Sequence, residues 1–127
     1  MAIRTELSLR LPNSPGSLAR ACRTLSDGRI HLIALSLDAS GTLRVVVDNH
    51  LHAAAALREQ HYQVDERDVL YAVMPNQPGS LANTLRLVAD AGVNVDYAYA
   101  SAVENDPTVG IVIAVPDPMR ASAAAGI

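Results

Sequence analysis

Hydrophobic and polar residues alternate between positions 3 and 11. One set holds Ile3, Thr5, Leu7, Leu9 and Leu11, and the other holds Arg4, Glu6, Ser8 and Arg10. A period of two predicts a strand with one buried face. Leu18, Cys22 and Leu25 then recur at helical spacing, which predicts a helix ending near Asp27 with Cys22 in the core.

The same pattern occurs a second time. Residues 74–82 repeat residues 11–19 with two substitutions, at an offset of 63 that carries Pro12 to Pro75, and Leu81, Leu85 and Val88 repeat the helical face. A spacing of this length matches a small domain rather than one turn of a solenoid. We therefore predict two copies of one unit, residues 1–67 and 68–127.

Further elements follow in each copy. The first copy predicts strands at residues 30–38, 43–48 and 62–64 and a helix at 52–61. The second predicts strands at 69–74, 93–102 and 109–115, a helix at 78–91 and another starting near Pro118. The order β-α-β-β-α-β predicts an α+β, ferredoxin-like fold, an antiparallel sheet with both helices on one face.

The second copy lacks residues for its last strand, which leaves the strand at 69–74 without one neighbour. Because uncovered sheet edges are usually covered or used, we expect the first copy or another chain to fill this edge. Asn13 is predicted to cap the first helix. Gly28 and Gly92 are predicted to end helices in the left-handed conformation.

Composition excludes several classes of protein. The net charge is −3 and the Arg residues are scattered, which argues against a nucleic-acid partner. A single cysteine excludes an intrachain disulfide and fits a reducing compartment. No run of about 18 apolar residues predicts a membrane span. A cytoplasmic protein without membrane attachment is expected.

The repeated corner x-Pro-Asn-x-Pro-Gly-x-Leu-Ala, within β-α-β-β-α-β units, resembles tandem ACT domains. The resemblance implies a regulatory protein that binds an amino acid at the interface between ACT units and shifts their packing. A related motif in the family carries a leading His, an Asn, an Arg and a second Asn. Here the two Asn correspond to Asn76 and Asn94, with Met74 and Gln77 at the His and Arg positions.

In the first copy the same positions are Asn13 and His31, with Leu11 and Ser14 at the His and Arg positions. Only the second copy keeps both Asn residues, so we expect it to hold the better-formed site. The helix start behind each Pro-Gly offers unpaired N–H groups to a carboxylate. The predicted ligand contacts are Asn76, Gln77, Pro78, Gly79, Ser80, Asn94, Val95, Asn13, Ser14, Gly16 and His31.

Other interpretations stay open. Asn13 and Asn76 could serve only as helix caps, and Asn94 and His31 only as turn residues. A metal site at His50, His52 and His61 lacks a completing carboxylate or Cys cluster, and no catalytic motif occurs. We therefore expect no enzyme, metal or cofactor. The expected partners are an amino acid and a second copy in a homodimer, with a metabolic enzyme as a further candidate. A ligand-free docking module is the alternative function.

Overall fold

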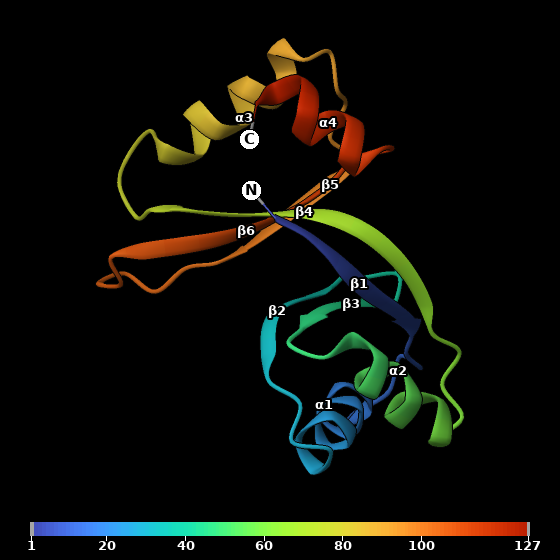
Figure 1. Ribbon diagram of the computed structural model, residues 1–127. Coiled ribbons are helices and arrows are strands. Elements are labelled where there is room, and N and C mark those ends of the chain that lie inside the picture. Colours follow the sequence, from blue (N-terminus) through green and yellow to red (C-terminus); the bar gives the residue numbers. More distant parts are fainter. Residues whose placement is uncertain (1, 127) are drawn as a thin grey trace. The chain divides into compact units, whose positions relative to one another are not determined.

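The computed structural model describes residues 2–126 (Figure 1). Strands and helices follow one another in the order β1 (Ala2–Arg10), α1 (Ser17–Asp27), β2 (Leu32–Leu37), β3 (Thr42–Val47), α2 (His50–Glu59), β4 (Asp65–Pro75), α3 (Ser80–Asp90), β5 (Tyr97–Ser101), β6 (Thr108–Ala114) and α4 (Pro118–Ala125). The order β-α-β-β-α therefore occurs twice, which confirms the predicted duplication and fold class.

The chain forms two compact units. The first unit is residues 5–67, and the second unit contains residues 2–4 and 68–126. Both β1 and β4 contribute residues to each unit. Each unit has its own apolar core, as expected for small domains built from one sheet and two helices.

In the first unit, β3 lies between β2 and β1, and both pairings are antiparallel. The apolar positions of β1 face the core as the alternation predicts, with Leu7 opposite Val45 and Leu9 opposite Leu43. Helices α1 and α2 cover this face of the sheet (Figure 1). Leu57 of α2 is fully buried among these side chains.

In the second unit, β6 lies between β4 and β5, again antiparallel, and α3 and α4 cover one face (Figure 1). The other neighbour of β4 is β1, whose residues 2–4 belong to this unit. The guanidinium carbon of Arg4 lies 5.2 Å from the ring centre of Tyr71 on β4, within cation–π range. The first strand of the chain thus provides β4 with a neighbour on this side, as predicted.

The predicted strand at residues 62–64 does not form. His61 adopts φ 68 after α2, and the Tyr62 N–H donates to the Leu57 carbonyl at 3.2 Å, which closes the end of the helix. The Val64 carbonyl accepts from the Arg58 side chain at 2.9 Å. Because these backbone groups form hydrogen bonds with the end of α2, they do not join the sheet, and β4 begins only at Asp65.

Two burial predictions for the first unit are wrong. Cys22 is only half-buried, and Ala21 takes the core position instead. The helix therefore turns a slightly different face inward than the Leu-Cys-Leu spacing predicts. Glu6, expected on a solvated face of β1, is 1% exposed and lies opposite the fully buried Val46 on β3.

The ends of the first helices of the two repeats differ. Gly92 follows α3 in the left-handed region at φ 72, as predicted. Gly28 does not, since its φ is −82, and the left-handed residue is Arg29 at φ 56. At the repeat offset of 63, Arg29 corresponds to Gly92, so the first copy holds an arginine in a conformation that favours glycine.

Candidate functional site

Each Pro-Gly corner places a glycine at the start of a helix. Gly16 precedes α1 with φ 85, and Gly79 precedes α3 with φ 90. These left-handed conformations are strained for residues with a Cβ, so the glycines set the direction in which each helix leaves the corner. Neither helix has a side-chain cap, and the prediction that Asn13 caps α1 is therefore wrong.

The helix starts keep free amide groups. The Ser17 N–H donates to the Ser14 carbonyl at 3.3 Å, and the first bond of helical spacing runs from Arg20 to Gly16. Between them, the N–H groups of Leu18 and Ala19 have no backbone acceptor within residues 2–126. Ser80 and Asn83 make the corresponding bonds at α3. Each corner thus presents donors and the positive end of a helix dipole.

In the first unit, the corner opens onto a cavity of about 510 Å³. Its walls are the corner, the first turn of α1 and the β2–β3 turn, and they include the predicted contacts Asn13, Ser14 and Gly16. Asn13 is exposed, and no group within the described part of the chain bonds to its amide. This volume lies in the range typical of small-molecule sites.

In the second unit, the side-chain amide of Asn76 is already engaged in hydrogen bonds within the chain. Its Nδ2 group donates to the carbonyls of Val103 at 2.9 Å and Asp106 at 3.0 Å, and its backbone N–H donates to Pro107 at 3.0 Å. An amide group has two side-chain donors, and both are used here. Asn76 therefore holds the β5–β6 loop and has no side-chain N–H left for a ligand carboxylate.

The positions of the leading His are apolar and buried. Leu11 is 8% exposed and belongs to the core of the first unit, and Met74 is 6% exposed in the core of the second. Neither side chain offers a polar group to a ligand. The remaining predicted corner residues, Gln77, Pro78 and Gly79, are exposed, and Ser80 is half-buried.

Asn94 and Val95 lie beyond the other end of α3. This helix has 11 residues, so it separates Gly79 from Asn94 by about 16 Å. Asn94 Nδ2 donates to Asp96 Oδ1 at 3.2 Å, while Val95 packs partly against the core. His31 occupies the same place after α1, where its backbone N–H donates to Asp48. Within one unit, a single amino acid cannot contact both Asn76 and Asn94.

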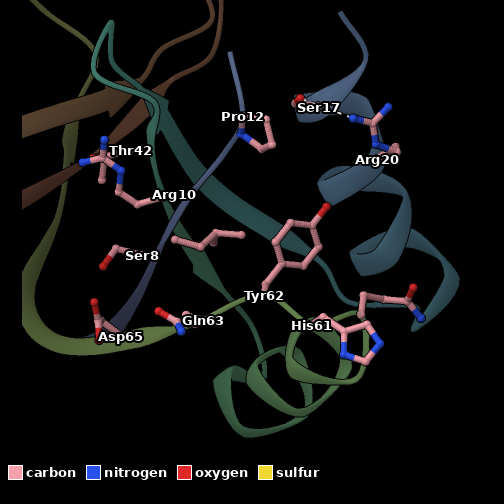
Figure 2. Close-up of a pocket in the computed structure, with 12 residues that line it drawn as sticks. Ser8, Arg10, Pro12, Ser17, Arg20, Thr42, His61, Tyr62, Gln63 and Asp65 are labelled. Atoms are coloured by element: carbon pink, nitrogen blue, oxygen red, sulfur yellow. Dashed lines mark hydrogen bonds between the residues drawn. The ribbon is translucent and has the colours of Figure 1, made fainter. Parts of the chain in front are cut away.

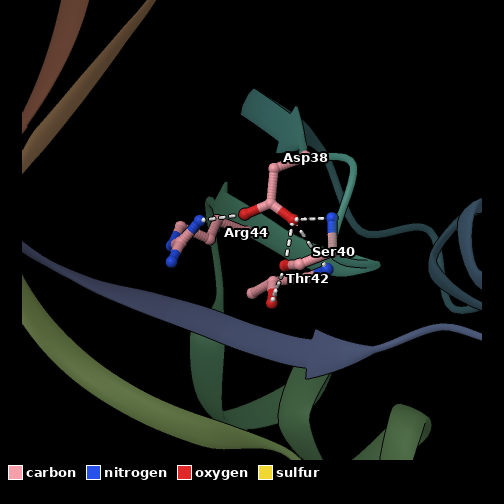
Figure 3. Close-up of polar contacts among 4 residues, drawn as sticks. All are labelled: Asp38, Ser40, Thr42 and Arg44. Carbon is pink, nitrogen blue, oxygen red and sulfur yellow. Dashed lines mark hydrogen bonds and ion pairs between the residues drawn. The ribbon is translucent and has the colours of Figure 1, made fainter.

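Asp38, on the wall of the corner cavity, was not predicted from the sequence. Its Oδ1 accepts from Ser40 Oγ at 2.5 Å and from the Ser40 and Thr42 N–H groups at 3.0 and 3.2 Å (Figure 3). Its Oδ2 pairs with Arg44 at 3.1 Å. The signal in the sequence is Asp-x-Ser-Gly between two apolar runs, a turn in which Asp bonds the backbone.

These bonds lower the pKa of Asp38 to about 2 from its ordinary 3.8, chiefly through the Ser40 hydroxyl and the Thr42 N–H. Because the folded pKa is depressed, the carboxylate contributes stability above about pH 4 and loses it as the pH falls towards 2. We expect Asp38→Asn to lower the melting temperature at neutral pH, by an amount that shrinks across this acid window. Melting curves at a series of pH values measure this. A difference that persists at pH 2 would contradict the role of the charge.

The histidines do not assemble into a site. His50 and His52 lie in the first turn of α2, and His61 follows its last turn, so the helix separates them. Among residues 2–126, no three His, Cys, Asp or Glu side chains are grouped as metal ligands would be.

No helix in this range has the length and apolar character needed to cross a membrane.

The fold and the two corners together define a pair of ferredoxin-like repeats, and at the start of its first helix each repeat has N–H groups without backbone acceptors within residues 2–126. The family model described as an ACT domain pair matches residues 1–122. The chain belongs to this family. A comparison with curated protein sequences finds no match.

Solved structures share this fold. Protein BT0572 from Bacteroides thetaiotaomicron is 30% identical, with a TM-score of 0.87, over 96% of this chain and 85% of that one. The ligand-free regulatory subunit of aspartate kinase from Thermus thermophilus is 19% identical, with a TM-score of 0.72, over 98% and 89%. Its counterpart from Thermus flavus is 17% identical, with a TM-score of 0.69, over 98% and 90%.

Proposed function

We propose that this protein is a regulatory module that binds a free amino acid at the Pro-Gly corner of its first unit. One observation carries the proposal: the cavity that joins Asn13, Ser14 and Gly16 to unpaired N–H groups at the start of α1. The ligand carboxylate accepts from the Leu18 and Ala19 N–H groups, where the helix dipole favours negative charge. The Asn13 amide adds a donor or an acceptor.

The first unit is preferred to the second because its asparagine is available. The loop after β5, residues 102–107, is two residues longer than the β2–β3 turn, residues 38–41, and it uses both side-chain donors of Asn76. In the first unit the shorter turn leaves Asn13 without a partner. This reverses the preference for the second copy that its pair of Asn residues suggests.

The geometry also supports a site shared between two chains. His31 and Asn94 lie a helix length away from the corners of their own units. A zwitterion spans only a few ångströms, so any contact from these residues must come from another ACT unit. We therefore propose that two copies form a homodimer across the site, and that the ligand favours one packing of the ACT units by binding it more tightly.

The partner we propose is an enzyme of amino-acid metabolism. This rests on the likeness to regulatory subunits of aspartate kinase. In such an arrangement, binding of the amino acid would change the packing of the ACT units, and this change would alter the activity of the enzyme according to the amino-acid concentration. The differential affinity of the ligand for the two packings sets the limit of that effect.

A melting-temperature screen of the common amino acids tests the proposal. A ligand at a hundred times its dissociation constant stabilises the native state by about 2.7 kcal/mol, which gives a clear shift. We expect Asn13→Ala to abolish the shift while leaving the unliganded protein as stable as the parent.

Asn76→Ala should lower the free energy of unfolding by about 1–3 kcal/mol, since two carbonyls lose their donors, and should keep the shift.

The outcomes separate the site from the function. If no amino acid produces a shift, the protein is better described as a ligand-free docking module. If a shift survives Asn13→Ala and disappears in Asn76→Ala or Asn94→Ala, the second unit holds the ligand. Sedimentation of the parent with and without ligand then measures whether binding changes the assembly.

A further inference from the structure

A second cavity, of about 670 Å³, lies in the first unit. The end of β1, the start of α1 and the segment from Gln60 to Asp65 line it (Figure 2). It shares only Pro12 and Ser17 with the corner cavity, and none of the ligand contacts predicted from the sequence lines it. The proposed amino-acid site therefore leaves this cavity without a role.

A third cavity, of about 650 Å³, lies between α1 and α2. Three residues line both it and the second cavity, namely Arg20 of α1 and Gln60 and Tyr62, which follow α2. Side chains that border two cavities stand at the boundary between them. Arg20, Gln60 and Tyr62 are thus brought together from two separate parts of the first unit, and we call them the boundary cluster.

The boundary cluster carries hydrogen-bond donors that the chain does not use. An arginine has several N–H donors, and the one side-chain bond of Arg20 runs from its Nη2 to the Oγ of Ser17 at 3.3 Å. Within residues 2–126, the Tyr62 hydroxyl and the Gln60 side-chain amide form no hydrogen bond. The cluster therefore offers three kinds of donor at one place.

No carboxylate of the described chain neutralises Arg20. The acids that line the two cavities are Asp27, Glu59 and Asp65, and none of them forms an ion pair with Arg20. Asp27 pairs instead with Arg23, at 3.3 Å. The positive charge of the boundary cluster is left for an anion from solution.

The guanidinium of Arg20 is held beside the start of its own helix. Its Nη1 lies 3.2 Å from the place that a Cβ would take at Gly16, and its partner Ser17 is 5% exposed. Figure 2 shows the Tyr62 hydroxyl directed to the same side as Arg20, whereas Arg10 lies beyond the other side of the ring and takes no part. An arginine whose position is fixed loses less side-chain entropy when it binds an oxyanion.

We propose that the boundary cluster binds the oxyanion group of a small organic anion. The oxyanion pairs with Arg20 and accepts from the Tyr62 hydroxyl, and the Gln60 amide is a further donor. The body of the ligand lies in the second cavity, where Leu9 and Pro12 add apolar surface to the Tyr62 ring. The oxyanion is a carboxylate or a phosphate, since a guanidinium binds both in the same two-pronged geometry. This site is independent of the amino-acid site proposed above.

NMR titrations of the full chain test the proposal with butyrate as the carboxylate probe, monobutyl phosphate as the phosphate probe and butyramide as the uncharged control. We expect the better anion to bind at least about tenfold more tightly than butyramide and to shift the amide signals of residues 60–63. Acetate should bind more weakly than butyrate, because it lacks the carbon chain that meets the apolar wall. Binding should weaken as salt is added, since Arg20 is exposed.

Matched variants locate the site. Arg20→Gln should raise the dissociation constant about tenfold or more, and Tyr62→Phe, which keeps the ring, about fivefold. Arg86→Gln makes the same change of net charge on α3 of the second unit and should leave binding unchanged. Asn13→Ala should also leave it unchanged, which separates this site from the amino-acid site. Melting curves check that the variants fold.

Three results would overturn the proposal. The first is equal binding of butyramide and the better anion, which would show that no charge is recognised. The second is no binding of any probe at about 10 mM. The third is binding by a folded Arg20→Gln variant as tight as that of the parent, which would place the anion elsewhere on the chain.

Discussion

Replacing Gly110 with alanine is expected to lower the free energy of unfolding by about 3 kcal/mol, at the upper end of the usual cost of overpacking. Gly110 lies inside β6, paired with Val73 of β4 and Ser101 of β5, so the backbone is held from both sides. A Cβ at this position would overlap the Tyr71 hydroxyl and lie 2.6 Å from the ring carbon Cζ. Either the ring or the strand has to move.

A double-mutant cycle in chemical denaturation measures this effect. Tyr71→Leu removes the ring and should itself destabilise the second unit, since Tyr71 also lies under the Arg4 guanidinium. In the Tyr71→Leu background, Gly110→Ala should cost at least about 1 kcal/mol less than in the parent, because the clash is gone. Additive effects of the two substitutions would show that the ring is not the obstacle.

Leu57→Ala is expected to destabilise the first unit by about 3 kcal/mol, within the range measured when a buried leucine is truncated to alanine. Leu57 of α2 is fully buried against the side chains of β1 and β3. The core around Leu57 consists of aliphatic side chains without Phe or Trp, and a close-packed core of this kind relaxes only partly into the space that a truncated side chain leaves.

The same helix supplies the control. Leu51 lies two turns earlier on α2 and is 70% exposed, so Leu51→Ala should change stability by less than about 0.5 kcal/mol. Urea titrations of both variants compare the midpoints. Similar losses for the two leucines would mean that helix propensity or the unfolded state, and not the core, sets the cost.

The elements of this fold follow from local patterns in the sequence. The alternation in β1 identifies Leu7 and Leu9 as core residues, and the repeated Pro-Gly corner marks both helix starts and the duplication. These features depend on neighbours a few positions apart. Local periodicity does not separate Ala21 from Cys22, because residues 18, 21, 22 and 25 stand at i, i+3, i+4 and i+7, so both fit the same apolar face.

The candidate site is less visible from the sequence because it depends on distant residues. The corners repeat almost unchanged, yet Asn76 bonds carbonyls 27 and 30 positions away while Asn13 has none to bond. The predicted strand ranges leave a longer loop at residues 103–108 than at residues 39–42, but the hydrogen bonds of that loop cannot be predicted from the sequence. The same holds for the cavity beside Tyr62, which exists because the end of α2 uses backbone groups that an isolated strand pattern assigns to a sheet.

Because of the first strand, the two units cannot be separated at the sequence boundary between the repeats. Residues 2–4 belong to the same unit as residues 68–126, although 63 positions of the other unit separate them along the chain. Dividing the gene at the sequence boundary between the copies would give one fragment with a surplus strand end and another with an unprotected β4. We therefore expect the two repeats to fold best as one chain, and a circular permutant would have to keep residues 2–4 joined to residues 68–126.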